Sequence, residues 1–127
     1  MATDTRRETV IEERNLSAPA ALAIGAFLVA FGLAGFLALG NGIPLGLLQA
    51  SMPLNILHLG AGAVLFSAAI LGARPARLAS FAAALLFLAL AVVGLAGVQS
   101  VALSAADTTV DLVLGLVLLA VGRLAPR

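Results

Sequence analysis

The sequence predicts an all-α membrane protein with four transmembrane helices and both termini in the cytoplasm. Three observations predict it. Apolar residues make up 62% of the 127 residues and charged residues only 10%, against about a quarter charged in ordinary soluble domains. Four stretches are long and apolar enough to cross a bilayer core of about 30 Å. The basic residues, all arginines, fall on one side of these four stretches.

The first two spans are expected over residues 19–39 and 54–71, after a polar leader of residues 1–18. The apolar run of span one exceeds the roughly 7–15 residues of a secretory signal core, and four acidic residues precede it, so it predicts a retained helix. Pro53 suits the first turn of span two, and Gly72 suits the position just after its end. We expect spans one and two to form a hairpin.

Spans three and four are expected over residues 76–97 and 108–124, followed by a short tail of residues 125–127. Span four is the shortest and contains a charged residue, Asp111. One domain of residues 19–124 therefore contains all four spans.

The arginines predict the orientation of the bundle. The connections 40–52 and 98–107 contain no basic residue, and every arginine lies before span one, between spans two and three, or after span four. This distribution obeys the positive-inside rule, so both termini are expected in the cytoplasm of a bacterial inner membrane. The arginines concerned are Arg6, Arg7, Arg14, Arg74, Arg77, Arg123 and Arg127.

Composition excludes several classes of function. Because the chain has no cysteine, it forms no disulfide and binds no iron–sulfur cluster through thiolates. A net charge of only +1 argues against nucleic-acid binding, which requires a basic face. The abundance of Ala, Gly and Leu, with arginine but no lysine, is typical of a bacterium with a GC-rich genome.

Spans two and four share a pattern. "PLNILHLGAGAVL" and "DTTVDLVLGLVLL" superpose at a spacing of 53 residues, which aligns polar, ionisable and glycine positions in that order. Residues at i, i+3 and i+7 lie on one face of a helix, so each span presents one such stripe. Spans one and three match only as segments rich in alanine and glycine. The pattern predicts a duplicated two-helix hairpin, with the aligned pairs Asn55 and Thr108, His58 and Asp111, Gly62 and Gly115.

His58 and Asp111 are predicted to meet across spans two and four. Each lies about 6 Å from the expected start of its span, at 1.5 Å per residue. A buried carboxylate costs about 2.5–3.5 kcal/mol at mid-bilayer unless it finds a donor, and His58 is the ionisable donor at that depth. Gly62 and Gly115 are expected to let the two helices approach closely just below the pair.

These residues resemble a group of small bacterial four-helix membrane proteins of unknown function. Members carry N-x-x-H-x-x-x-G in the second span, matched here by Asn55, His58 and Gly62, and often D-N-x-x-H-x-x-x-G in the fourth. In the second copy Asp107 and Gly115 match, whereas Thr108 replaces the asparagine and Asp111 the histidine. The resemblance covers residues 17–124 and implies the four-span fold but no activity.

Four interpretations of His58 are open. A structural role, with the imidazole satisfied by Asp111 and Asn55, is favoured. The alternatives are an axial ligand of a chlorophyll-type pigment or haem, a proton or ion pathway, and a metal site, which one histidine and one aspartate make poorly. No cofactor is predicted. Asn55 and Thr108 are interpreted as helix-start caps rather than ligands.

The expected function is non-enzymatic: an accessory or scaffold subunit that packs against other membrane proteins or itself. The sequence has no nucleotide-binding loop, no metal cluster and no continuous polar path. A pigment- or haem-binding protein is the alternative, and a proton-linked transporter the third. The small residues of span one, Ala21, Gly25, Gly32 and Gly35, predict a packing face, which would be a docking surface if it faced outward.

Overall fold

The computed structural model describes residues 16–41, 51–97 and 103–124. These residues form four α-helices, α1 (Ser17–Asn41), α2 (Met52–Leu71), α3 (Ala73–Leu95) and α4 (Ala105–Arg123). The four predicted spans are confirmed, although α2, α3 and α4 begin two or three residues before the predicted 54, 76 and 108. The predictions for residues 1–15 of the leader, for residues 42–50 and 98–102 of the connections and for the 125–127 tail lie outside the described residues.

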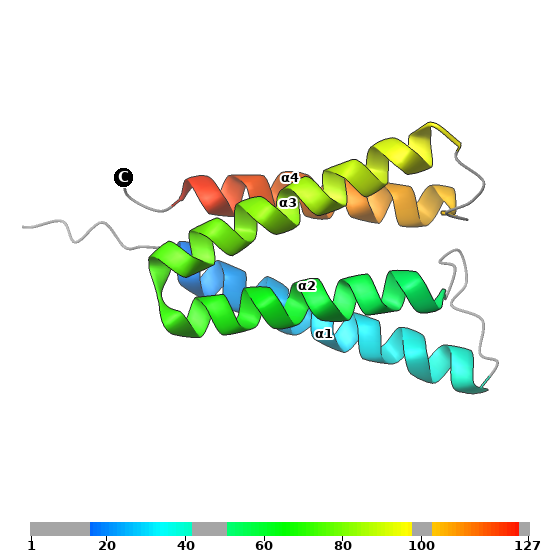
Figure 1. Ribbon diagram of the computed structural model, residues 1–127, viewed down its shortest axis with the longest axis horizontal. Helices are drawn as coiled ribbons and strands as arrows, with labels where there is room; N and C mark the ends of the chain where they lie inside the picture. Colours follow the sequence, from blue (N-terminus) through cyan, green and yellow to red (C-terminus); the bar gives the residue numbers. More distant parts are fainter. Residues whose placement is uncertain (1–15, 42–50, 98–102, 125–127) are drawn as a thin grey trace, which may run out of the picture.

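Consecutive helices run antiparallel (Figure 1). The start of α1, the α2–α3 connection and the end of α4 lie at one end of the bundle, on the left of the view, and α2 and α4 begin at the other end. The most extensive contacts are those of α1 with α2 and of α3 with α4. The fold is therefore two hairpins placed side by side.

Serine residues cap the N-termini of α2 and α4. The Ser51 hydroxyl accepts a hydrogen bond from Leu54 N at 3.3 Å. Ser104 forms a capping box, in which its hydroxyl accepts from Asp107 N at 3.1 Å and its own N–H donates to Asp107 Oδ2 at 3.1 Å. Both bonds satisfy N–H groups that the first turn of a helix leaves without a partner.

The prediction that Asn55 and Thr108 cap these helices is wrong. Each lies one turn inside its helix, four residues after the serine that caps it. Because the helices begin earlier than predicted, His58 and Asp111 each lie six positions after the first residue of their helix. At 1.5 Å per residue this is about 9 Å. The pair is deeper in the bundle than the sequence predicted, and the two residues remain at equal depth.

A single residue, Gly72, joins α2 to α3. Its φ of 124° lies in a region that residues with a side chain rarely adopt. Its N–H closes α2 by donating to the Ala68 carbonyl at 3.2 Å. Glycine at this position allows the chain to reverse within one residue.

The α1–α2 hairpin is packed backbone against backbone. A Cβ added to Gly25 would lie 2.7 Å from Phe66 N, and one added to Gly62 would lie 2.7 Å from Val29 N. A Cβ on Gly32 would be 2.9 Å from the Asn55 carbonyl oxygen. The small-residue face of α1 therefore faces inward onto α2, which answers the question that the sequence left open.

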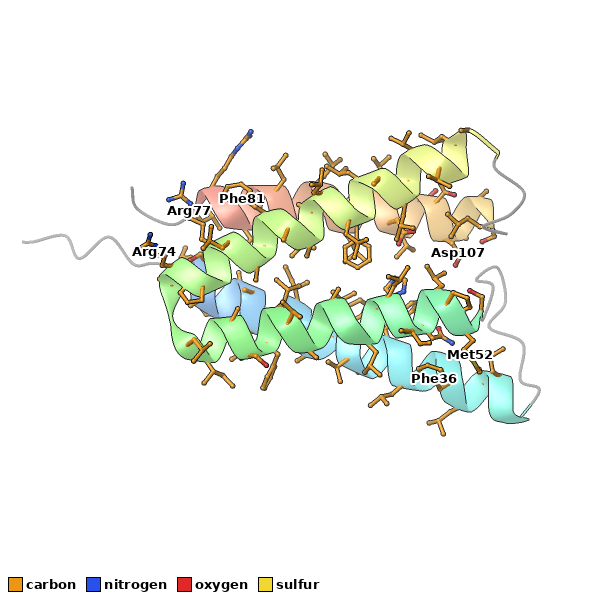
Figure 2. All side chains as sticks on the ribbon, viewed as in Figure 1. Phe36, Met52, Arg74, Arg77, Phe81 and Asp107 are labelled. Atoms are coloured by element: carbon orange, nitrogen blue, oxygen red, sulfur yellow. The ribbon has the colours of Figure 1, made fainter. Side chains whose placement is uncertain are left out.

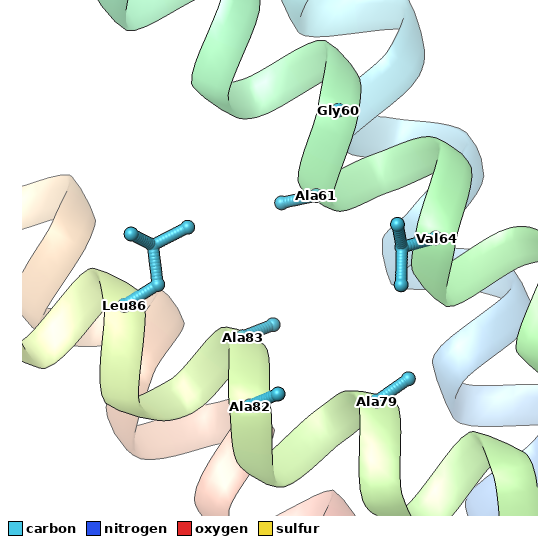
Figure 3. Close-up of a pocket in the computed structure, with 7 residues that line it drawn as sticks. All are labelled: Gly60, Ala61, Val64, Ala79, Ala82, Ala83 and Leu86. Atoms are coloured by element: carbon cyan, nitrogen blue, oxygen red, sulfur yellow. The ribbon is translucent and has the colours of Figure 1, made fainter.

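The two hairpins contact each other less closely than the helices within each hairpin. A groove of about 240 Å³ lies between α2 and α3 (Figure 3). Small side chains line most of it, including Ala61 on α2 and Ala79 and Ala83 on α3. The interface between the hairpins is therefore packed more loosely than the interface within each hairpin, and it leaves this groove.

The outer surface of the bundle is apolar. Leu71, Leu85 and Leu95 are each more than 70% exposed, and all four helices are long and apolar enough to cross a membrane. Large apolar side chains are exposed on all four helices, as expected of a surface that another apolar phase covers. The chain is therefore a multi-pass membrane protein whose outer surface contacts lipid.

Buried positions recur between the two hairpins. Each residue buried in α2 has a buried counterpart in α4 at a spacing of 53, and five buried positions of α1 have buried counterparts in α3 at a spacing of 59. The two hairpins thus bury equivalent faces. The α2 positions are Leu54, Asn55, His58, Gly62, Leu65 and Ala68, and the α1 positions are Ser17, Ala21, Gly25, Leu28 and Gly32.

Candidate functional site

His58 lies on the face of α2 that is turned into the bundle, and its side chain is buried. The Nδ1 atom lies 2.8 Å from the carbonyl oxygen of Leu54, one turn earlier on the same helix. A carbonyl oxygen only accepts hydrogen bonds, so Nδ1 is the donor and carries a hydrogen. This bond fixes the orientation of the imidazole ring and directs Nε2 away from α2.

Asp111 lies on the inward face of α4 and is fully buried. Its Oδ1 is 3.6 Å from His58 Nε2, within ion-pair distance. The structure thus places next to each other the two ionisable side chains that the sequence pattern aligned. The separation exceeds that of a direct N–H···O hydrogen bond, and neither Nε2 nor either carboxylate oxygen makes a hydrogen bond within the described residues.

Two phenylalanines enclose the imidazole. The ring of Phe31, on α1, meets it edge-on with centroids 5.2 Å apart, and the ring of Phe87, on α3, lies tilted at 5.4 Å. Both separations are within the range of ordinary aromatic contacts. Because Asp111 approaches from α4, His58 contacts a side chain from each of the other three helices. The imidazole therefore lies where all four helices meet.

Asn55 is not a partner of His58, contrary to the prediction. The Asn55 side chain lies directly over Gly35 of α1, where a Cβ would collide with its amide group. Its Nδ2 is buried and makes no hydrogen bond within the described residues. The hydrogen-bond partner of His58 on α2 is the Leu54 carbonyl and not the predicted Asn55 side chain, because Nδ1 of the ring reaches back one turn along its own helix.

Thr108 occupies the equivalent position in the second hairpin. Its side chain lies over Gly94 of α3, where an added Cβ would collide with the hydroxyl. The hydroxyl donates to the Ser104 carbonyl at 3.0 Å, within α4. Asn55 and Thr108 therefore each fill a notch left by a glycine on the partner helix, a contact that a search of α1 and α3 for glycines at matching positions could have found.

Gly62 and Gly115 do not bring α2 and α4 together, and that prediction is wrong. A Cβ on Gly62 would meet α1, and one on Gly115 would lie 2.7 Å from Leu88 Cγ on α3. Each glycine serves the interface within its own hairpin. The helices α2 and α4 are farther apart than the two helices of one hairpin, and the side chains of His58 and Asp111 extend across the space between them.

Charged groups are distributed unevenly along the bundle. Figure 2 shows Arg74 and Arg77 at the end where α2 joins α3, and Asp107 at the opposite end. Arg77 lies over the Phe81 ring with its guanidinium carbon 5.7 Å from the centroid, a cation–π contact. Among the described residues no three His, Asp or Glu side chains are grouped to hold a metal ion.

Comparison with known proteins adds no relative to this site. No family model, no curated protein and no solved structure matches the chain.

Proposed function

We propose that this protein is a small non-enzymatic subunit of the bacterial inner membrane that packs against other membrane proteins or a second copy of itself. One observation carries the proposal: the His58–Asp111 pair is enclosed by all four helices. A pair in that position stabilises the arrangement of the helices. Contact with the surroundings is then made by the apolar outer surface of the bundle.

The outer face of α1 supports contact with another helix. Ala26, Ala30 and Ala34 are exposed and recur every fourth residue, which places them in a row along the helix. Small residues at this spacing let a second membrane helix approach closely. This outward row is distinct from the inward glycine face that packs on α2.

The geometry of His58 favours a structural role over axial ligation of a pigment or haem. An axial ligand offers a metal the lone pair of a ring nitrogen. Here Nδ1 is bonded to the Leu54 carbonyl, and Nε2 faces Asp111 from inside the bundle. An absorbance spectrum of the purified protein tests this choice. A visible band that disappears in His58→Ala would establish a bound pigment and contradict the structural role.

Association is tested with substitutions on exposed alanines. After the mass of bound detergent is subtracted, wild-type protein extracted from its native membrane in mild detergent should have a mass above that of one chain, 12.7 kDa. Ala30→Ile widens the row on α1 and should reduce the particle to a single chain, whereas Ala89→Ile, at an exposed alanine of α3, should leave it unchanged. Wild-type protein that migrates as a single chain would overturn the proposal.

We also infer that both termini are cytoplasmic. Arg74 and Arg77 at the α2–α3 connection and Arg123 at the end of α4 lie at the same end of the bundle, which supports the positive-inside orientation. Cysteines introduced at Ser51 and Ser104 should react with an impermeant reagent added to the periplasmic face, and one at Ala73 should not. Labelling at Ala73 from that face would reverse the topology.

The recurrence of buried positions supports a duplicated hairpin as the origin of the chain. It also supports the resemblance to small four-helix proteins with a doubled N-x-x-H-x-x-x-G pattern. On this proposal Ser51 and Ser104, which cap their helices at the same spacing of 53 residues, extend the repeated pattern by one turn.

A further inference from the structure

We propose that His58 and Asp111 together bind one proton, which reaches them from the bundle end where α2 and α4 begin. The proposal concerns the protonation of the pair and does not depend on which partner the outer surface contacts. Its basis is a count of donors and acceptors at the site.

The Leu54 carbonyl determines the count. Because Nδ1 donates to it at 2.8 Å, a neutral His58 has its single ring hydrogen on Nδ1 and a lone pair on Nε2. An ionised Asp111 has acceptors only. Without a further proton, two acceptors would face each other across 3.6 Å in a buried site, and Asp111 would leave a net negative charge there.

One proton resolves this conflict. On Nε2 it makes an imidazolium that pairs with the carboxylate at ion-pair distance, and on Asp111 it makes a neutral carboxylic acid that faces the Nε2 lone pair. Both forms hold the same number of protons and give the pair no net charge, which a buried site requires. A second proton would leave the pair positively charged, so the site binds one.

Within the described residues, the elements around the pair place no positively charged side chain beside it. Phe31 of α1 and Phe87 of α3 face the imidazole, and His58 is the one ionisable residue of α2. On α4, Asp107 lies one turn from Asp111 and is bonded to Ser104. The described arginines lie at or near the opposite end of the bundle. With no described arginine beside Asp111, we assign the balancing positive charge to a proton.

On α2 and α4, buried polar residues lie beside the pair only toward the helix starts; the buried serines nearer the opposite end, Ser17 and Ser80, lie on α1 and α3. Between Asp111 and the start of α4, the buried face carries Thr108 and Asp107. Beyond Asp111 the same face continues as Gly115, Leu118 and Val121. On α2 the sequence is the same in kind, with Asn55 before His58 and apolar residues after it. Proton exchange is therefore expected from the end where α2 and α4 begin.

The proton count can be measured directly, because the chain has one histidine. Nitrogen-15 labelling of histidine gives a single imidazole, whose chemical shifts report which ring nitrogens carry hydrogen. Infrared difference spectra of wild type and Asp111→Asn identify the carboxyl band of Asp111. We expect either an imidazolium with an ionised Asp111, or a neutral imidazole protonated on Nδ1 with a protonated Asp111.

A neutral imidazole beside an ionised Asp111, or a bare Nδ1, would overturn the proposal. The wild-type spectra decide this alone, so the test does not depend on a variant folding. In Asp111→Asn the amide can donate to Nε2, and we expect a neutral imidazole with its hydrogen on Nδ1. Thr109→Val, a change at an exposed residue of the same helix, should leave the imidazole shifts as in wild type.

One-sided access has its own test. Thr108→Val removes a buried hydroxyl between the pair and the helix start and should slow hydrogen–deuterium exchange at the pair, whereas Thr109→Val, at the exposed neighbour, should not. Equal rates in both variants would overturn the access route. In liposomes with a pH difference, wild type should conduct no more protons than empty vesicles. Proton flux that Asp111→Asn abolishes would show access from both ends and contradict the proposal.

Discussion

The two hairpins bury equivalent positions with different residues. In α1–α2 the close contacts are between backbones, because glycines meet at Gly25 and Gly62. In α3–α4 the position equivalent to Gly25 is Ala84, and Gly115 faces the side chain of Leu88. A methyl group added at Gly62 in the first hairpin meets backbone atoms at 2.7–2.8 Å, which only a helix movement relieves. In the second, at Gly115, it meets the Leu88 side chain first and the Leu88 backbone nitrogen at 3.1 Å, so moving a side chain relieves the closest contacts.

The His58–Asp111 pair also arises from a difference between the two hairpins. Equivalent positions of the two hairpins carry His58 and Asp111, and these face each other across the hairpin interface. Two identical residues there would present identical groups. Because one is a base and the other an acid, one shared proton leaves the pair with no net charge. A difference between the two hairpins at this position thus provides the polar contact between them.

Adding a methyl group to each equivalent glycine should separate the hairpins most clearly. Gly62→Ala places its Cβ against the backbone of α1, at 2.7 Å from Val29 N and 2.8 Å from the Gly25 carbonyl. We expect it to lower the free energy of unfolding by about 3 kcal/mol, the upper end for an overpacked core. Gly115→Ala should cost about 1 kcal/mol, because the Leu88 side chain can shift.

The measurement is unfolding of each variant in detergent, followed by circular dichroism. Gly60→Ala is the control for the higher helix propensity of alanine, because Gly60 is exposed and no atom lies within 4 Å of an added Cβ. Equal costs at Gly62 and Gly115 would mean that the two hairpins tolerate volume alike, contrary to the comparison.

Removing one member of the central pair should have the next largest effect. His58→Leu or Asp111→Leu leaves the other side chain buried without its partner, which costs about 2 kcal/mol of unfolding free energy. The double variant should lose less than the sum of the single costs, with a coupling of about 0.5–2 kcal/mol. Strictly additive costs, measured by the same unfolding experiment, would show that the two residues do not interact.

The helix caps should show the smallest difference. Ser104 makes three hydrogen bonds with Asp107, two of them through its hydroxyl, whereas Ser51 accepts one at 3.3 Å. Ser104→Ala should therefore lower the free energy of unfolding by about 1 kcal/mol and Ser51→Ala by a few tenths, within the range of N-cap substitutions. A larger cost at Ser51 would mean that its single bond is the more important cap.

Several features could be predicted from the sequence because they depend on local pattern. The four spans follow from the length of the apolar runs. The approach of His58 to Asp111 follows from equal spacing along two helices that run in the same direction. Helix starts were placed two or three residues late, because the capping serines Ser51 and Ser104 lie in segments that are not strongly apolar.

The tertiary structure decided which neighbour each buried face meets. The helical period shows that His58 and Gly62 lie on the same face of α2. That face is wide enough to contact both α1, its partner in the hairpin, and the helices of the opposite hairpin. Only the packed helices show that Gly62 faces α1 while His58 faces α4, and that the Leu54 carbonyl holds the imidazole. Contacts between distant segments arise from how whole helices fit together, and the periodicity of one helix does not contain that information.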